Sequence, residues 1–140
     1  MKITTKGRYA IHILYDLAVN GTEHPVSVKE MATRQEISVK YTEQIISILN
    51  KAGYVSSSRG FQGGYRLTKP LDEYVIGDIL RLTEGSLAPV GGLATAENPC
   101  PKQQKCATIM LWEKVDKAIR DVVDHVTLQD LLDWQKQERC

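Results

Sequence analysis

Two helical patterns separated by a short turn and followed by a glycine-rich hairpin constrain the fold of this chain more than any other feature. Ser27-Val-Lys-Glu30 has the spacing of a capping box and opens a short helix through about Arg34. Ser38 can cap a second helix, in which apolar residues recur at helical spacing until Gly53. Two helices joined by about three residues, the second of them amphipathic, predict a helix-turn-helix.

The segments on either side extend this motif to a winged helix. Upstream, Thr4 or Thr5 can cap a helix with an apolar face that ends at Gly21. Downstream, residues 54–58 and 65–68 have the pattern of two short strands, and the glycines between them permit the positive φ angles of a hairpin tip. Three helices and a β-hairpin predict a mainly α fold with a small β-hairpin wing, a winged helix-turn-helix.

The second half of the chain is expected to hold a connecting helix, a long loop and a long helix. The connecting helix spans about Tyr74 to Thr83. Residues 85–103 lack periodicity, and a loop of that length is usually functional or disordered. The long helix begins at about Cys106, and Thr127 can cap a short final helix.

The long helix carries apolar residues at alternating steps of three and four, which is the pattern of a coiled-coil seam. These residues are Trp112, Val115, Ile119, Val122 and Val126. The opposite face is charged, so a protruding helix with this seam needs a partner, and a second copy of the chain is the simplest one. We predict a homodimer, with burial of the seam against the chain's own domain as the open alternative. The predicted parts are a winged helix-turn-helix DNA-binding domain at 1–70, a connecting helix at 71–84, a cysteine-bearing effector loop at 85–105, and the dimerisation helix with a short C-terminal helix at 106–140.

Charge is divided unevenly along the chain. Residues 1–70 carry ten Lys and Arg against five Asp and Glu, whereas residues 71–140 carry eight against twelve. The basic half is therefore expected to meet a polyanion, with chance asymmetry as the alternative. The amino terminus lacks the apolar run of a signal peptide and no segment approaches membrane-spanning length, so we expect a cytoplasmic protein with no membrane partner.

The winged helix predicts how the basic half would contact DNA. In this geometry the last of the three helices enters the major groove by its N-terminal end. Near that end, Gln44 can pair with an adenine edge, Glu43 can accept from a cytosine amino group, and Lys40 can reach a guanine or a phosphate. A solvated helix face is the alternative for Lys40 and Glu43 taken singly. The predicted DNA-binding residues are Lys40, Tyr41, Glu43, Gln44, Arg59, Lys6 and Arg8.

Arg59 stands at the hairpin tip, where a wing arginine commonly enters the minor groove, although an ordinary turn arginine is possible. Lys6 and Arg8, with Lys2, are expected to contact phosphates, which positions a protein on DNA without reading sequence. The histidines at 12, 24 and 125 have no partner evident in the sequence, and no phosphate-binding glycine motif precedes a helix. We therefore expect that the protein is not an enzyme.

The cysteines form an incomplete pattern. Cys100 and Cys106 fit a zinc site poorly, because five residues separate them and two ligands are too few. An iron–sulfur cluster needs four ligands, so the pair could supply half of one, with Cys140 as a possible third. A disulfide is disfavoured in a reducing compartment. A thiol redox protein that uses Cys100 and Cys106 is an alternative of a different class, although no C-x-x-C motif supports it.

Four stretches together resemble the IscR family of winged-helix transcription regulators, whose relatives include NsrR and CymR. They are MKITTKGRYA, ISVKYTEQIISILNKAGYV, SSSRGFQGGYRL and CATIMLWEKVDKAI. The RGxxGGY wing and the C-x-T-x-x-L-W junction are the most specific parts, and the resemblance covers nearly the whole chain. It implies a homodimer formed by the long C-terminal helix and a palindromic operator in double-stranded DNA that the recognition helix and wing contact. It also implies a [2Fe-2S] cluster through which members repress iron–sulfur cluster assembly genes.

The resemblance also implies a ligand set that this chain does not complete. Family members of this branch hold the cluster with three cysteines and one other residue. Cys100 and Cys106 match the last two of these cysteines, but the first, expected near Gly92, is missing, and the histidine of some members is Ile109 here. A ligand could come from Cys140, Glu97 or the partner subunit; a cysteine near Gly92 could have been replaced; or the protein could be a cluster-free, CymR-like regulator of cysteine metabolism that acts with a partner protein.

Overall fold

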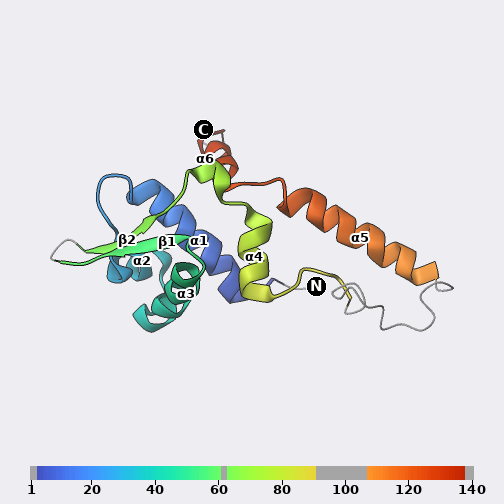
Figure 1. The fold of residues 1–140 in the computed structure, drawn as a ribbon, viewed down its shortest axis with the longest axis horizontal. Helices are drawn as coiled ribbons and strands as arrows, with labels where there is room; N and C mark the ends of the chain where they lie inside the picture. The colour runs from blue at the N-terminus through green and yellow to red at the C-terminus, as the bar shows by residue number, and fades with distance from the viewer. Residues whose placement is uncertain (1–2, 61–62, 91–106, 138–140) are drawn as a thin grey trace.

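The computed structural model of the chain describes residues 3–60, 63–90 and 107–137. The described elements are α1 (Thr5–Asn20), α2 (Val28–Gln35), α3 (Val39–Lys51), β1 (Val55–Ser58), β2 (Gly64–Leu67), a 3-10 turn (Leu71–Glu73), α4 (Ile76–Glu84), α5 (Ala107–Val123) and α6 (Leu128–Gln137). Figure 1 shows α2, α3 and the two-stranded wing at one end of the molecule and α5 at the other, with α4 between them. The mainly α fold with a hairpin wing is therefore confirmed.

The predicted helix caps account for where the first three helices begin. Thr4 Oγ1 accepts from the Gly7 amide at 3.3 Å, Ser27 Oγ from the Glu30 amide at 3.1 Å, and Ser38 Oγ from the Tyr41 amide at 3.0 Å. Each bond satisfies an amide that the first turn leaves without an intrahelical partner. These local interactions account for the first residues of α1, α2 and α3.

The hydrophobic core lies around α1. The side chains that are no more than 2% exposed include Ile13, Leu14 and Leu17 of α1, Ile45 and Leu49 of α3, Ile79 of α4, and Leu128 of α6. Because α1 contacts α2, α3, α4, α6 and β2, it is the element on which the winged helix and the C-terminal helices are assembled.

Tyr74 was expected within the connecting helix but lies before it, in extended conformation. Its carbonyl oxygen accepts from the Leu128 amide at 2.9 Å, and the next residue but one, Ile76, donates to the Val126 carbonyl at 2.9 Å. This short antiparallel bridge to the segment between α5 and α6 delays the start of α4. The fully buried Tyr74 hydroxyl donates to the Tyr54 carbonyl at 2.6 Å and accepts from the Thr68 amide at 2.9 Å, so its burial leaves no polar atom unpaired.

The wing is an antiparallel hairpin in which Val55 faces Leu67 and Ser58 faces Gly64. Val26 forms an isolated antiparallel bridge with Tyr65 of β2, so the segment before α2 pairs with the wing at this one position. Gly60 has φ of 109°, as expected at a hairpin tip. The same expectation is wrong for Gly63 and Gly64, which do not have positive φ. They are required instead by close approach, since a Cβ at Gly64 would overlap the Val26 carbonyl oxygen.

The predicted seam residues of the long helix α5 do not all face the same way. Ile119 and Val126 pack against the core together with Val123, and Val126 lies beyond the end of α5. Val122, by contrast, is 60% exposed. The five predicted positions therefore do not form one outward stripe, because α5 docks its C-terminal half on its own domain. None of the described helices is both long and apolar enough to cross a membrane.

The apolar residues of α5 that face away from the domain form a different stripe. Leu111 is 52% exposed, Ala118 is exposed, and Val115 is half-buried. Together with Val122 they follow each other at steps of four, three and four, which is again the a/d spacing of a helix seam. Figure 1 shows the N-terminal half of α5 extending away from the rest of the described chain. The outward stripe is therefore Leu111, Val115, Ala118 and Val122.

Candidate nucleic-acid interface

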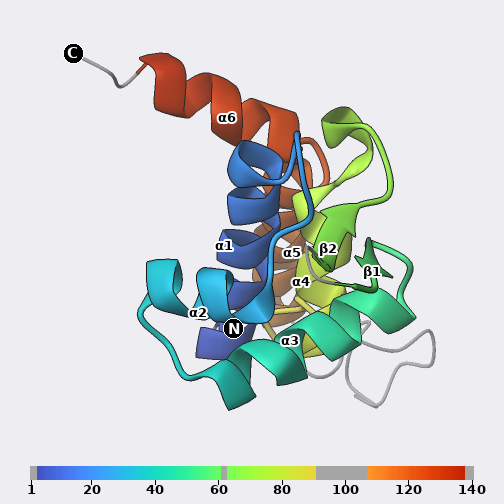
Figure 2. The same ribbon diagram turned by 90° about the vertical axis from the view of Figure 1, so that its left-hand side faces the viewer.

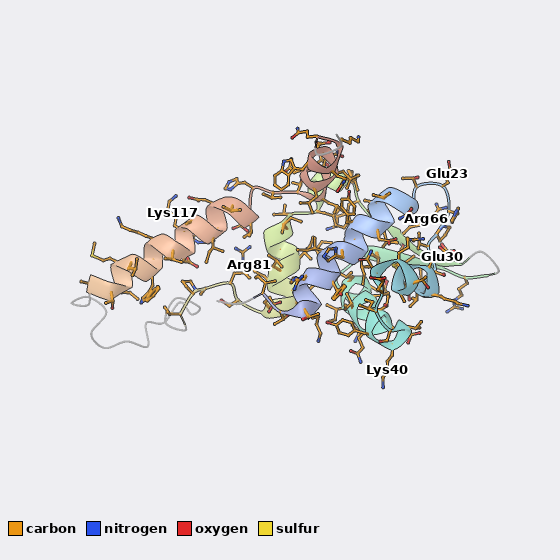
Figure 3. All side chains as sticks on the ribbon, turned by 180° about the vertical axis from the view of Figure 1, so that it is seen from behind. Glu23, Glu30, Lys40, Arg66, Arg81 and Lys117 are labelled. Atoms are coloured by element: carbon orange, nitrogen blue, oxygen red, sulfur yellow. The ribbon has the colours of Figure 1, made fainter. Side chains whose placement is uncertain are left out.

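Helix α3 separates a buried apolar face from an exposed polar one. Ile45, Ile46 and Leu49 are buried, which leaves the side chains at the start of the helix outside. Lys40, Glu43 and Gln44 are all exposed. Figure 2 shows α3 running across one end of the molecule, and Figure 3 shows Lys40 projecting away from the body. Three of the four predicted residues of this helix are thus accessible to a duplex.

Tyr41 lies differently from its neighbours. It is half-buried, and its ring stands edge-on to that of Tyr9, with 6.1 Å between centroids and an angle of 84° between the planes. Thr42 is fully buried, and its hydroxyl donates to the Ser38 carbonyl at 2.9 Å. Tyr41 therefore joins α3 to α1, and only its accessible edge is available for the predicted DNA contact.

Val39, the first residue of α3, was missed by the sequence analysis. It is an apolar side chain that is 45% exposed among exposed polar residues. Val39 lies seven residues before the buried Ile46 and so in line with the buried face of α3, which means that apolar periodicity carried no signal of its exposure. An exposed aliphatic group at the start of a recognition helix can contact the methyl group of thymine.

The wing and the start of α1 carry the remaining predicted cations. Arg59 is exposed at the end of β1, next to Gly60, and the neighbouring tip residues 61–62 lie outside the described residues. Arg8 is exposed and Lys6 is half-buried in the first two turns of α1, whereas Lys2 lies outside the described residues. The described structure thus leaves the predicted base-reading and phosphate-contacting groups accessible to different degrees, and their roles stay predictions.

A buried carboxylate, which the sequence analysis also missed, fixes the helix-turn-helix. Asp16 of α1 is 3% exposed and accepts from Arg34 Nε at 2.9 Å, Arg34 Nη2 at 2.7 Å and Gln35 Nε2 at 3.1 Å. The hydrogen bond to Asp16 raises the pKa of Arg34 above its ordinary value, although partial desolvation opposes the shift. Glu36 follows in left-handed conformation, with φ of 56°. An acidic residue inside the apolar face of α1 was the signal for this site.

A second ion pair joins α4 to α5. Arg81 Nη1 and Nη2 donate to the two carboxylate oxygens of Asp124 at 2.6 and 3.0 Å, and Figure 3 shows Arg81 between the two helices. These bonds raise the pKa of Arg81 and lower the pKa of Asp124. Gly77 lies under the pair, where a Cβ would overlap the Asp124 carboxylate. The close contact between α4 and α5 therefore depends on a glycine.

The predicted cluster ligands are not tested by the structure. Cys100, Cys106 and Cys140, with Gly92 and Glu97, lie outside the described residues. Among the described residues there is no group of three or more His, Cys, Asp and Glu side chains that could hold a metal ion. The ligand chemistry consequently rests on the sequence, in which three cysteines are fewer than the four ligands of an iron–sulfur cluster.

Comparison with known proteins identifies the family. The family model described as "Rrf2: Iron-dependent Transcriptional regulator" matches residues 3–134. The protein rrf2 of Nitratidesulfovibrio vulgaris is 42% identical over 133 residues, which cover 94% of this chain and 87% of that one. The transcriptional regulator CymR of Bacillus subtilis is 39% identical over 139 residues (99% and 95%), and IscR of Erwinia tasmaniensis is 34% identical over 136 residues (97% and 81%).

Solved structures agree with these sequence matches. The structure of CymR, described as the global cysteine regulator of B. subtilis, has a TM-score of 0.78 at 38% identity and covers 96% of this chain and 98% of its own. IscR of T. potens has a TM-score of 0.80 at 39% identity, with 100% and 92% covered. The relatives are transcription regulators, which agrees with the expectation that this protein binds DNA and is not an enzyme. The chain belongs to the Rrf2 family of transcriptional regulators.

Proposed function

We propose that the protein is a homodimer that recognises a palindromic operator with α3 and the wing. The observation that carries this proposal is the exposed start of α3, where Lys40, Glu43 and Gln44 stand opposite the buried apolar face of the helix. An amide, a carboxylate and an ammonium group at one helix end can distinguish adenine, cytosine and guanine edges in the major groove. Arg59, which is exposed beside the hairpin tip, would enter the adjacent minor groove.

The homodimer is supported by the outward stripe of α5. Leu111, Val115, Ala118 and Val122 would be buried if two copies of α5 pack against each other about a twofold axis. A twofold dimer presents two copies of α3, so its operator would be an inverted repeat with half-sites about one helical turn apart.

The operator can be found by selecting bound duplexes from a random pool and measuring their affinity by fluorescence anisotropy between about 50 and 200 mM salt. We expect the selected sites to be inverted repeats, and affinity to fall steeply as salt rises, because phosphate contacts release counterions. Gln44→Ala should lose preference for one base pair without changing the salt dependence. Sites without symmetry, or binding that ignores salt, would contradict the proposal.

For the signal, we propose an iron–sulfur-cluster-sensing repressor of cluster assembly genes. The spacing of Cys100 and Cys106 supports this, as does the similarity to IscR proteins at 34–39% identity. A [2Fe-2S] cluster bound there would make its own occupancy the regulatory signal. Two thiolates are half of the required ligands, however, so Cys100 and Cys106 do not complete a site by themselves.

The incomplete ligand set favours a second candidate, a cluster-free regulator of cysteine metabolism that acts with a partner protein. The CymR relative of B. subtilis supports it, since its similarity extends over 99% of this chain. The two candidates predict different metal content. Anaerobic reconstitution with ferrous iron and sulfide should load about two irons per protomer if a cluster forms.

Reconstitution of cysteine variants distinguishes the cluster-sensing candidate from the cluster-free one. Cys100→Ser and Cys106→Ser should each abolish the visible absorption of a cluster, and Cys140→Ser tests whether the last residue is a ligand. Gly92→Cys should increase iron loading if a missing cysteine is what limits the site. Wild-type protein that binds no iron, alongside a Gly92→Cys variant that also binds none, would refute cluster sensing and support the cluster-free candidate.

A further inference from the structure

The last residue of α4 contacts the first turn of α1, 80 residues earlier in the chain. Glu84 Oε1 accepts from the Thr4 amide at 3.1 Å and from the Thr4 hydroxyl at 2.5 Å. Thr4 is itself the N-cap of α1, since its hydroxyl oxygen accepts from the Gly7 amide. The start of α1 is therefore held by a carboxylate from a different helix.

Gly7 leaves room for this contact because it has no side chain. It is a buried residue inside α1, where glycine is less favourable than alanine by about 1 kcal/mol. A Cβ at this position would overlap the Glu84 carboxylate and lie 3.1 Å from the Thr83 hydroxyl oxygen. A side chain at position 7 would displace the Glu84 carboxylate from its place beside Thr4.

The charge of Glu84 also complements α1. The first turn of a helix carries partial positive charge and is stabilised by a nearby carboxylate. The first turn of α1 contains no acidic residue of its own. Glu84 therefore supplies from α4 the negative charge that the α1 sequence lacks.

The same turns of α1 carry Lys6 and Arg8, the predicted phosphate contacts. We propose that Glu84 is a positioning residue for DNA binding, which fixes the start of α1 so that Lys6 and Arg8 reach the DNA backbone. This inference rests on the proposed function, because it requires α1 to contact operator DNA. It assigns to an acidic residue a favourable effect on DNA affinity.

The direction in which DNA affinity changes when Glu84 is replaced distinguishes positioning from simple electrostatics. Removing a negative charge close to DNA should by charge alone strengthen binding and steepen its salt dependence. If Glu84 positions two cations, Glu84→Ala should instead weaken operator binding several-fold and reduce the slope of log affinity against log salt by about 1 to 2, one for each lost phosphate contact. Glu84→Gln keeps an acceptor oxygen for Thr4, so it should bind as tightly as wild type or more tightly.

The test is a mutant cycle on full-length protein with the selected operator. Glu84→Ala, the pair Lys6→Ala with Arg8→Ala, and all three together are compared by anisotropy from about 50 to 200 mM salt. Because Glu84 is proposed to act through these cations, the triple variant should bind no more weakly than the double variant. Glu73→Ala, at an exposed glutamate in the 3-10 turn, serves as the matched control and should change nothing.

The outcomes are distinguishable. Circular dichroism melting identifies a Glu84→Ala variant that is unfolded, in which case a Gly7→Ala variant, which crowds the same contact, carries the test and should bind the operator more weakly with a reduced salt slope. Glu84→Ala that binds as tightly as wild type with an unchanged salt slope would overturn the inference and leave the proposed function intact. Wild-type protein without operator preference, unaffected by loss of Lys6 and Arg8, would overturn the proposed function and with it this inference.

Discussion

Replacing Asp16 by alanine should destabilise the protein by about 2–3 kcal/mol, although Asp16 lies in α1 and its partners lie in α2. The carboxylate is 3% exposed and accepts two hydrogen bonds from Arg34, one from Gln35 and a longer one of 3.5 Å from Asn20. Alanine would leave the donors of Arg34 and Gln35 without their acceptor at the point where α2 ends and the turn to α3 begins. The change therefore tests whether this pair holds the helix-turn-helix on α1.

The magnitude follows from how much of the pair is buried. Breaking a fully buried ion pair costs about 3–5 kcal/mol, because the remaining charge is left without a partner. The Arg34 side chain is 38% exposed, so its guanidinium can turn towards water and the cost falls. A charge-assisted hydrogen bond is worth about 1.5–3 kcal/mol, which sets the lower end of the range.

Urea denaturation at one fixed protein concentration measures the effect, since a dimer would otherwise change stability with concentration. Asp72→Ala, at an exposed carboxylate in the 3-10 turn, is the control and should stay within about 0.5 kcal/mol of wild type. A double-mutant cycle of Asp16→Ala with Arg34→Ala should give a coupling of about 1–2 kcal/mol. A loss below about 1 kcal/mol with no coupling would refute the reasoning.

Four further outcomes are expected. Arg59→Ala should cost about 1–3 kcal/mol of operator binding by anisotropy, and an unchanged affinity would remove it from the interface. Val122→Glu should yield monomers in light scattering, whereas a variant that stays dimeric would show that the outward stripe of α5 is not the interface. Val39→Ala should abolish a preference for thymine over uracil at one operator position, since uracil lacks only the methyl group. The Arg81 hydrogen bond lowers the folded-state pKa of Asp124, so its stabilisation is present above the unfolded pKa of about 3.9 and is lost as pH falls through the folded value. Asp124→Asn should accordingly flatten the pH dependence of unfolding below about pH 4 in urea titrations.

The elements that the sequence predicted are those set by local interactions. The caps at Thr4, Ser27 and Ser38 each act on an amide three residues ahead, and Gly53 has the positive φ of 82° expected after a helix. Each of these signals involves residues only a few positions apart, so it can be recognised in the sequence itself. The contact between Thr4 and Glu84 joins positions 80 residues apart, and no local pattern encodes it.

The seam of α5 shows a different limit. Apolar periodicity indicates which residues avoid water but not whether their own chain or a second copy covers them. Ile119 is covered by the domain's own core, whereas Val122, three residues on, is 60% exposed. Placing Glu at position 119 would therefore damage the fold, and placing it at 122 tests the dimer. Which side of α5 docks on the core decides between the two roles.

Helix α4 has a polar contact with the C-terminal end of α5 on one side and with the start of α1 on the other. Arg81 binds Asp124, the residue directly after α5, and Glu84, almost one turn further along α4, binds Thr4 at the start of α1. Both contacts are polar and partly exposed, and such contacts exchange at a cost of about 1 kcal/mol, whereas the buried apolar side chains of α4 hold it against the core. Arg81 and Glu84 thus connect the C-terminal end of α5 and the start of α1 to one helix, which is held on the core by its own buried apolar side chains.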